Sequence, residues 1–93
     1  MSIFAVTYHY TDDAETISAL RPEHRAWTKA QHEAGRNLAS GPIVDVAGAL
    51  LIFKADSVEE LTEILKDDPF EVAGLIEERV IQQWNPINSP WSE

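Results

Sequence analysis

His24 is the side chain in this sequence best suited to acid–base chemistry. An imidazole titrates at about pH 6.5, so it can accept or donate a proton near neutrality. A lone helical histidine also often makes only one structural hydrogen bond, and this alternative stays open. His9 and His32 do not complete a metal site, because His24 and His32 lie eight residues apart, roughly 12 Å along a helix, without the i, i+4 spacing of zinc-binding histidines. We therefore predict proton transfer at His24 with neither a metal nor a cofactor.

Four further residues are predicted to contact a substrate. The guanidinium of Arg36 could hold a carboxylate or phenolate, although a solvated or ion-paired arginine is the simpler explanation. Ser40 could contact a ligand, and the backbone at Ser40 and Gly41 could steady an oxyanion. No nucleophile elbow surrounds Ser40, so serine hydrolase chemistry is not predicted. Tyr8, on the same strand face as Tyr10, could line a pocket for a ring or could belong to the core.

The element that must position His24 is a helix, predicted from Pro22 to about Ala34. Pro22 suits the first helical position, because its missing N–H would have no partner there. Gly35 suits the end, where a left-handed residue closes many helices. Alanines at four-residue intervals mark the buried side, and His24 falls at the border of this stripe, in the first turn. The helix N-terminus would then favour the neutral imidazole.

The rest of the chain alternates between strand and helix patterns. Ser57 begins a capping box in front of a second amphipathic helix. Asp68 suits the cap of a short helix that begins at Pro69. Gly41–Pro42 inside the second strand indicates an edge or a bulge. Strands are predicted at residues 3–10, 38–46, 49–54 and 76–84, and a loop with one helical turn at residues 11–20.

This order of elements predicts one α+β domain over residues 1–93, with a ferredoxin-like βαββαβ fold, a four-stranded antiparallel sheet and an irregular tail at residues 85–93. Two helices can cover only one face of such a sheet. The first and third strands carry apolar residues on both faces, so the uncovered face should be buried. A homodimer through this open sheet face, reinforced by Trp84 and Trp91, is the simplest solution.

The composition excludes several classes of partner. The net charge is −9, and only seven lysines and arginines are present, so no basic face is expected for nucleic acid or an anionic membrane. The chain has no cysteine, which excludes disulfides and thiolate-bound metals. The N-terminal residues lack a signal-peptide pattern, and no apolar stretch reaches the length of a membrane span, about 18 residues. We expect a cytoplasmic protein with a small-molecule ligand.

Three stretches together resemble the YCII-like (YCII-related) domain family: RPEHRAW, HEAGRNLASGP and DDPFEVAGL. The resemblance covers nearly the whole chain, with Phe70 where the family commonly has tyrosine and a loop around residues 46–49 that looks shorter than in many members. The family is similar in fold to muconolactone isomerase and the dimeric α/β-barrel proteins, and a dehydrochlorinase of a hydroxylated chloroaromatic belongs to it. The resemblance implies a ferredoxin-like protomer, a sheet-to-sheet dimer (dimeric α/β barrel), and a cleft with His24 and Asp68 as the catalytic pair.

Two functions fit these residues. In the first, a lyase or isomerase acts on a small cyclic or aromatic substrate, with His24 as the acid–base group and Asp68 orienting its ring. In the second, the fold is a non-catalytic dimeric ligand-binding or interaction module, and Asp68 is only a helix cap. A monooxygenase, as in other dimeric α/β-barrel proteins, would rest on fold alone. A hydrogen bond between His24 and Asp68 in a concave pocket would favour the enzyme, and a filled cleft the module.

Overall fold

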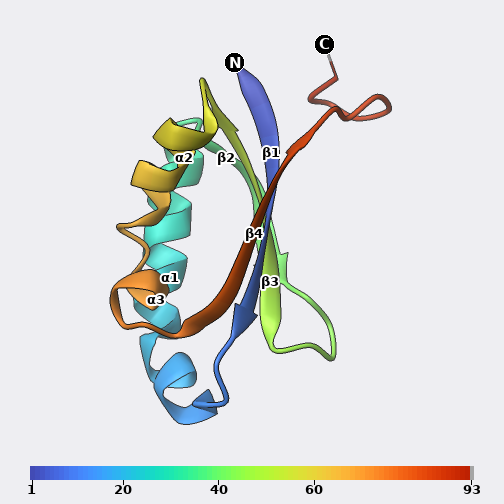
Figure 1. Ribbon diagram of the computed structural model, residues 1–93. Coiled ribbons are helices and arrows are strands. Elements are labelled where there is room, and N and C mark those ends of the chain that lie inside the picture. The colour runs from blue at the N-terminus through green and yellow to red at the C-terminus, as the bar shows by residue number, and fades with distance from the viewer. Residues whose placement is uncertain (93) are drawn as a thin grey trace.

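In residues 1–92, which the computed structural model describes, four antiparallel strands form one sheet and three helices cover one of its faces (Figure 1). The strands lie in the order β2-β3-β1-β4. This confirms the predicted ferredoxin-like arrangement. Within the same residues no helix is long and apolar enough to cross a bilayer. The elements are β1 (Ser2–Tyr10), α1 (Ala14–Glu33), β2 (Asn37–Pro42), β3 (Gly48–Ala55), α2 (Val58–Leu65), α3 (Pro69–Val72) and β4 (Ile76–Trp84).

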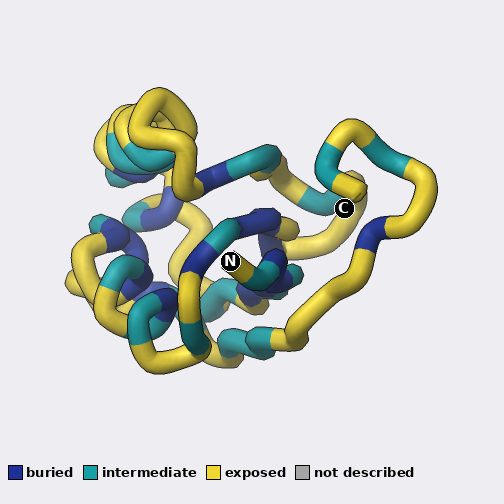
Figure 2. The backbone as a smooth tube through the Cα atoms, turned by 90° about the horizontal axis from the view of Figure 1, so that it is seen from above, coloured by how far each residue is buried: buried dark blue, intermediate teal, exposed yellow. Residues whose placement is uncertain are grey.

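The core lies between the sheet and the helices. Alternate residues of a strand point to the same face, so Val6 of β1 and its partner Leu51 of β3 are both fully buried on the helix side. Figure 2 shows buried positions where strands and helices face each other and exposed positions on the outer side of the helices. The core cluster consists of Phe4, Val6, Tyr8, Ala49, Leu51, Phe53, Ala55, Leu61 and Leu65. The central strand β3 therefore supplies much of the core of the domain.

Helix α1 begins at Ala14, so the predicted start at Pro22 is wrong. Asp13 is the N-cap: its carboxylate accepts hydrogen bonds from the Thr16 backbone N–H at 3.2 Å and from the Thr16 hydroxyl at 2.7 Å. Pro22 lies inside the helix, where it lacks the N–H of a regular helical hydrogen bond. His24 is consequently in the middle of α1. The field of the helix N-terminus, which decays within the first turn, therefore does not act on its imidazole as expected.

The C-terminal end of α1 agrees with the sequence. Gly35 has a φ of 83°, and its N–H donates to the carbonyl of His32 at 3.0 Å. The N–H of Arg36 donates to the carbonyl of Gln31, also at 3.0 Å. These two bonds form a Schellman motif, which requires the left-handed residue that glycine supplies. The chain then enters β2, an edge strand with a register shift near its start.

The hairpin between β2 and β3 is longer than the sequence predicts. Strand β2 ends at Pro42, and residues 43–47 form the turn that was expected to belong partly to the strand. At Gly48 the backbones of β1 and β3 come close together. A Cβ at Gly48 would overlap the carbonyl oxygen of Tyr8, so only glycine fits without a shift of the backbone. This close approach fixes the base of the hairpin against the sheet.

The face of the sheet away from the helices is partly covered by the same chain. The C-terminal segment after β4 lies on this side (Figure 1), and Trp91 shares the wall of a small hollow with Ile3 and Lys54. Trp91 also packs edge-on against Trp84, with ring centroids 6.4 Å apart. Elsewhere Leu50 is 43% exposed. The open face thus keeps an exposed apolar side chain at Leu50. Glu93, the last residue of the predicted tail, lies outside the described residues.

Candidate functional site

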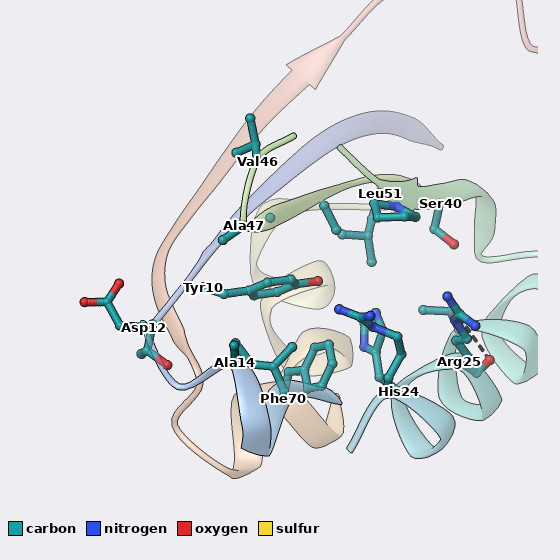
Figure 3. Close-up of a pocket in the computed structure, with 18 residues that line it drawn as sticks. Tyr10, Asp12, Ala14, His24, Arg25, Ser40, Val46, Ala47, Leu51 and Phe70 are labelled. Carbon is teal, nitrogen blue, oxygen red and sulfur yellow. Dashed lines mark hydrogen bonds between the residues drawn. The ribbon is translucent and has the colours of Figure 1, made fainter. Parts of the chain in front are cut away.

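A cavity of about 410 Å³ lies between α1, α3 and the hairpin of β2 and β3. Its volume falls within the range of small-molecule pockets, about 300–1,000 Å³. His24 of α1 lies in its wall (Figure 3), together with Phe70 of α3 and Tyr10 at the end of β1. The structure also places two of the predicted ligand-binding residues, Ser40 and Gly41, in this wall. The cleft is therefore open in this chain, not filled by its own side chains.

His24 and Asp68 are hydrogen-bonded to each other. The Nδ1 atom of His24 lies 2.8 Å from Oδ1 of Asp68. His24 is 9% exposed and Asp68 is completely buried, so the imidazole borders the cavity while the carboxylate lies behind it. The packing of α3 against α1 brings the two residues together from positions 44 residues apart. A buried carboxylate is costly unless it is hydrogen-bonded or paired, and His24 supplies this interaction.

This hydrogen bond decides what each nitrogen of His24 can do. An ionised carboxylate only accepts hydrogen bonds, so Nδ1 carries a proton and Nε2 of the neutral ring keeps a free lone pair. The imidazole also stacks on Phe70, with centroids 4.2 Å apart and planes at 12°. The hydrogen bond and the stacking together fix the orientation of the ring. Nε2 is therefore the atom left to exchange a proton with a ligand.

Tyr8 lies behind Asp68 and outside the cavity wall. Its side chain is fully buried, and the structure of residues 1–92 gives neither its hydroxyl nor Oδ2 of Asp68 a hydrogen bond of good geometry. Burial, followed by the negative charge of Asp68, raises the pKa of Tyr8 far above its usual range. Of the two roles that the sequence left open for Tyr8, the structure places its side chain in the core, outside the wall of the cavity.

Tyr10 reaches the cavity from the same strand face. Its hydroxyl points into the cavity (Figure 3), and its ring packs edge-on against Phe70 at a centroid distance of 5.2 Å. Burial and the charge of Asp68 raise the pKa of Tyr10, while the charge of Arg21 lowers it. Tyr10 is thus a neutral hydrogen-bond donor in the wall. Strand alternation predicts that Tyr8 and Tyr10 share a face of the sheet. It does not predict that Tyr8 is covered by the helices while Tyr10 borders the cavity.

Arg36, predicted to bind a substrate, lies outside the cavity wall. Its Nε donates to Oε1 of Gln31 at 2.6 Å, just past the end of α1. Two other arginines, Arg21 and Arg25, line the cavity instead. Their spacing places them on one helical face with His24. That signal was in the sequence, but a helix starting at Pro22 would have left Arg21 outside it.

Metal ligands do not gather in the described part of the chain. Among residues 1–92, no three histidine, aspartate or glutamate side chains are close enough together to hold an ion. His32 is engaged elsewhere, because its Nδ1 lies 2.8 Å from the backbone carbonyl oxygen of Asn37. The chemistry that the cavity side chains offer is hydrogen bonding, charge stabilisation and proton transfer at His24.

Sequence comparison places the chain in a family. The model of the YCII-related domain matches residues 1–85. The chain belongs to the YCII-related domain family. None of the curated proteins compared with it matches its sequence. The family assignment confirms the resemblance carried by the histidine, glycine and Asp-Pro-Phe motifs.

Solved structures share the fold of this YCII-related domain. A 5-chloro-2-hydroxyhydroquinone dehydrochlorinase of Burkholderia phenoliruptrix, in complex with 2,5-dihydroxybenzoquinone, is 20% identical, with a TM-score of 0.78 over 89% of this chain and 93% of that chain. A protein of Agrobacterium tumefaciens is 17% identical, with a TM-score of 0.57 over 99% and 97% of the two chains. A NIPSNAP family protein of the same species is 16% identical, with a TM-score of 0.57 over 97% and 94%. At these identities the likeness establishes the fold alone.

Proposed function

We propose that this YCII-related domain is a small-molecule enzyme that eliminates or isomerises a small cyclic or aromatic substrate. The observation that carries the proposal is the 2.8 Å hydrogen bond between His24 and Asp68 at the wall of an open cavity. A base held in one tautomer by a buried carboxylate, beside a space for a substrate, is the arrangement that general acid–base catalysis needs. A structural histidine could make the same hydrogen bond but would not need the open space beside its ring.

The reaction starts with proton transfer to Nε2 of His24. In an elimination, Nε2 removes a proton from the substrate, the freed electron pair forms a double bond, and a leaving group departs with its bonding electrons. In an isomerisation, the imidazolium returns the proton to a different carbon. Asp68 stabilises the imidazolium in either case, and the backbone at Ser40 and Gly41 steadies negative charge that develops on a substrate oxygen. No step requires a cofactor.

The comparison with the dehydrochlorinase supports this class of reaction. That protein covers most of the chain with a TM-score of 0.78, and its name describes an elimination on a chlorinated, hydroxylated ring. We also propose that the functional form is a homodimer through the open sheet face, where Leu50 remains 43% exposed in one protomer. Burial of this apolar side chain against a second copy would lower the free energy of the dimer relative to two separate protomers.

A ligand screen followed by kinetics tests the proposed function. Thermal-shift assays with small phenols, lactones and enol acids identify ligands that stabilise the protein, and ultraviolet absorbance then follows their conversion. We expect His24→Gln to bind the best ligand but to lower kcat by about 10²–10⁴-fold, the usual contribution of an acid–base group. His32→Gln is the matched control, because it makes the same change on the same helix outside the cavity wall. Equal turnover by wild type and His24→Gln would refute the acid–base role, and tight binding without turnover would favour the non-catalytic module.

A further inference from the structure

The cavity holds two positive charges in a strongly negative chain. The net charge is −9, and the chain has seven lysines and arginines in all, yet Arg21 and Arg25 both line the cavity. In residues 1–92 neither of them forms an ion pair, whereas Lys66 and Arg79 each pair with a glutamate. The two arginines of the cavity therefore have donors to offer to a ligand.

Helix α1 places these two charges on either side of the proposed base. Arg21 and Arg25 are one turn apart, and His24 lies on the same face. Figure 3 shows Arg25 near Ser40 at one end of the cavity, Tyr10 at the other, and His24 between them. The charge of Arg21 lowers the pKa of Tyr10, so the field of this second guanidinium reaches the Tyr10 side chain. A ligand lying over the imidazole would thus be within the field of both guanidinium groups.

The remaining wall offers little to compensate these charges. One carboxylate, Asp12, belongs to the lining, but Figure 3 shows it at the outer edge and turned away from the centre. The sheet side of the wall has an apolar part, which includes Leu51, Ala49 and Val46. Apolar surface on one side and fixed cations on the other suit a flat ring that carries a negative group.

We infer that the substrate is a small planar organic anion, whose ring carboxylate is held by Arg21 and Arg25 while the ring lies against Leu51 and Val46. The inference rests on the proposed function for the location of the site, and it adds the charge and chemical class of the substrate. A carboxylate is the expected group because its two oxygens match the paired donors of a guanidinium. Binding it beside His24 brings the neighbouring ring carbons to Nε2.

Binding of matched acids and amides tests this inference without any need for turnover. The probes are benzoate with benzamide, salicylate with salicylamide, and cyclohex-1-enecarboxylate with its amide, each titrated into the protein by isothermal calorimetry. We expect at least one acid to bind wild type about tenfold or more tightly than its amide, and its affinity to fall as sodium chloride is added. The double variant Arg21→Gln/Arg25→Gln should bring the acid-to-amide ratio close to one.

A second double variant controls for the change in net charge. Lys29→Gln/Arg36→Gln removes two positive charges from α1 and its C-terminal end, and neither residue lines the cavity, so the ratio should stay at its wild-type value. Thermal melts check that both variants are folded. The inference is overturned if amides bind wild type as tightly as the acids, if the preference survives the loss of Arg21 and Arg25, or if no acid in the series binds.

The outcome is separable from that of the proposed function. His24→Gln should keep the preference for acids, because the two arginines remain in place. Selective binding of acids, with no turnover of any ligand from the screen described above, would refute the enzyme and leave the anion site standing. Conversion of a neutral substrate, with no preference for acids, would leave the enzyme standing and refute the anion site.

Discussion

One oxygen of Asp68 serves both His24 and the first turn of α3. Oδ1 of Asp68 lies 2.8 Å from Nδ1 of His24 and 2.9 Å from the backbone nitrogen of Phe70, while Oδ2 is buried without a partner in the described residues. From the sequence, Asp68 could cap the helix, orient His24, or do both with its two oxygens. The structure combines the two roles, so the orientation of the imidazole is tied to the start of α3.

Two replacements of Asp68 should separate these roles. Asp68→Asn keeps an oxygen that can accept from the Phe70 N–H but removes the negative charge, so we expect kcat/KM to fall by about 10²–10⁴-fold with little change in stability. Asp68→Ala removes the acceptor for both donors and should lower the free energy of unfolding by about 2–4 kcal/mol. Urea denaturation and steady-state kinetics measure the two effects. Equal stability of the two variants would argue against the capping role.

Tyr8 should make the protein less stable in alkali. Its ordinary pKa is 10.0, and burial together with the Asp68 charge raises the pKa in the folded state. Above pH 10 the unfolded chain therefore loses this proton while the folded chain keeps it, so stability falls as pH rises, by up to about 1.4 kcal/mol per pH unit. Tyr8→Phe has no hydroxyl to ionise and so lacks this contribution to the pH dependence of stability. Urea melts from pH 8 to 11 should show a shallower decline for the variant, and parallel curves would contradict the assignment.

Much of the site was visible in the sequence, because its residues also carry local structural signals. Asp68 before Pro69 marks a helix start, and Gly35 marks a helix end, so both could be placed by turn chemistry alone. The family motif supplied what local rules could not, namely that Asp68 meets His24. That pairing joins α1 to α3, and the two residues are 44 positions apart in the sequence. A local sequence pattern cannot predict a contact between residues so far apart in the chain.

The misplaced features have a common cause. The start of α1 was assigned to Pro22 by its preference for first helical positions, although Asp13 is the residue that caps the helix. Residues 11–20 bury only one hydrophobic side chain, Ile17. Their sequence therefore has no clear apolar stripe, and its periodicity did not predict that the helix extends through them. Because the predicted helix began after Arg21, the sequence did not predict that Arg21 and Arg25 line the cavity together. Tertiary packing determines which side chains line the cavity, as it determines which of the two strand tyrosines is covered.

The cap of α1 can be tested directly. Asp13→Ala removes the acceptor of the Thr16 N–H and hydroxyl, so it should lower the melting temperature more than Asp12→Ala, which makes the same change in charge one residue earlier. The hydrogen bonds from Thr16 lower the pKa of Asp13 from 3.8. The stabilisation is therefore present above pH 3.8 and is lost as pH falls through the lower pKa of the folded state. A difference between the two variants that persists at the lowest pH would contradict this account.

The open face of the sheet should determine assembly. Leu50, 43% exposed, lies on this face, and Val72 of α3, 74% exposed, lies on the helix side. We expect wild type to sediment as a dimer, Leu50→Lys to shift it to monomer, and Val72→Lys to leave it dimeric, because a lysine is costly to bury in an apolar interface. A wild-type protein that stays monomeric at high concentration would refute the dimer. Leu51 and Phe53, which belong to the core of one protomer, would report on folding instead.

Gly48 should be the glycine whose replacement damages both stability and the cavity. A Cβ at Gly48 would overlap the backbone carbonyl of Tyr8, whereas a Cβ at Gly41 would meet no atom within 4 Å. Backbone atoms of paired strands cannot rotate away, so Gly48→Ala should cost about 2 kcal/mol or more by overpacking. It should also weaken ligand binding, because the displaced hairpin carries Val46 and Ala47 of the wall. Gly41→Ala is the matched control for urea denaturation and should be as stable as wild type, and equal loss in both variants would show that strand flexibility, not the close approach at Gly48, sets the cost.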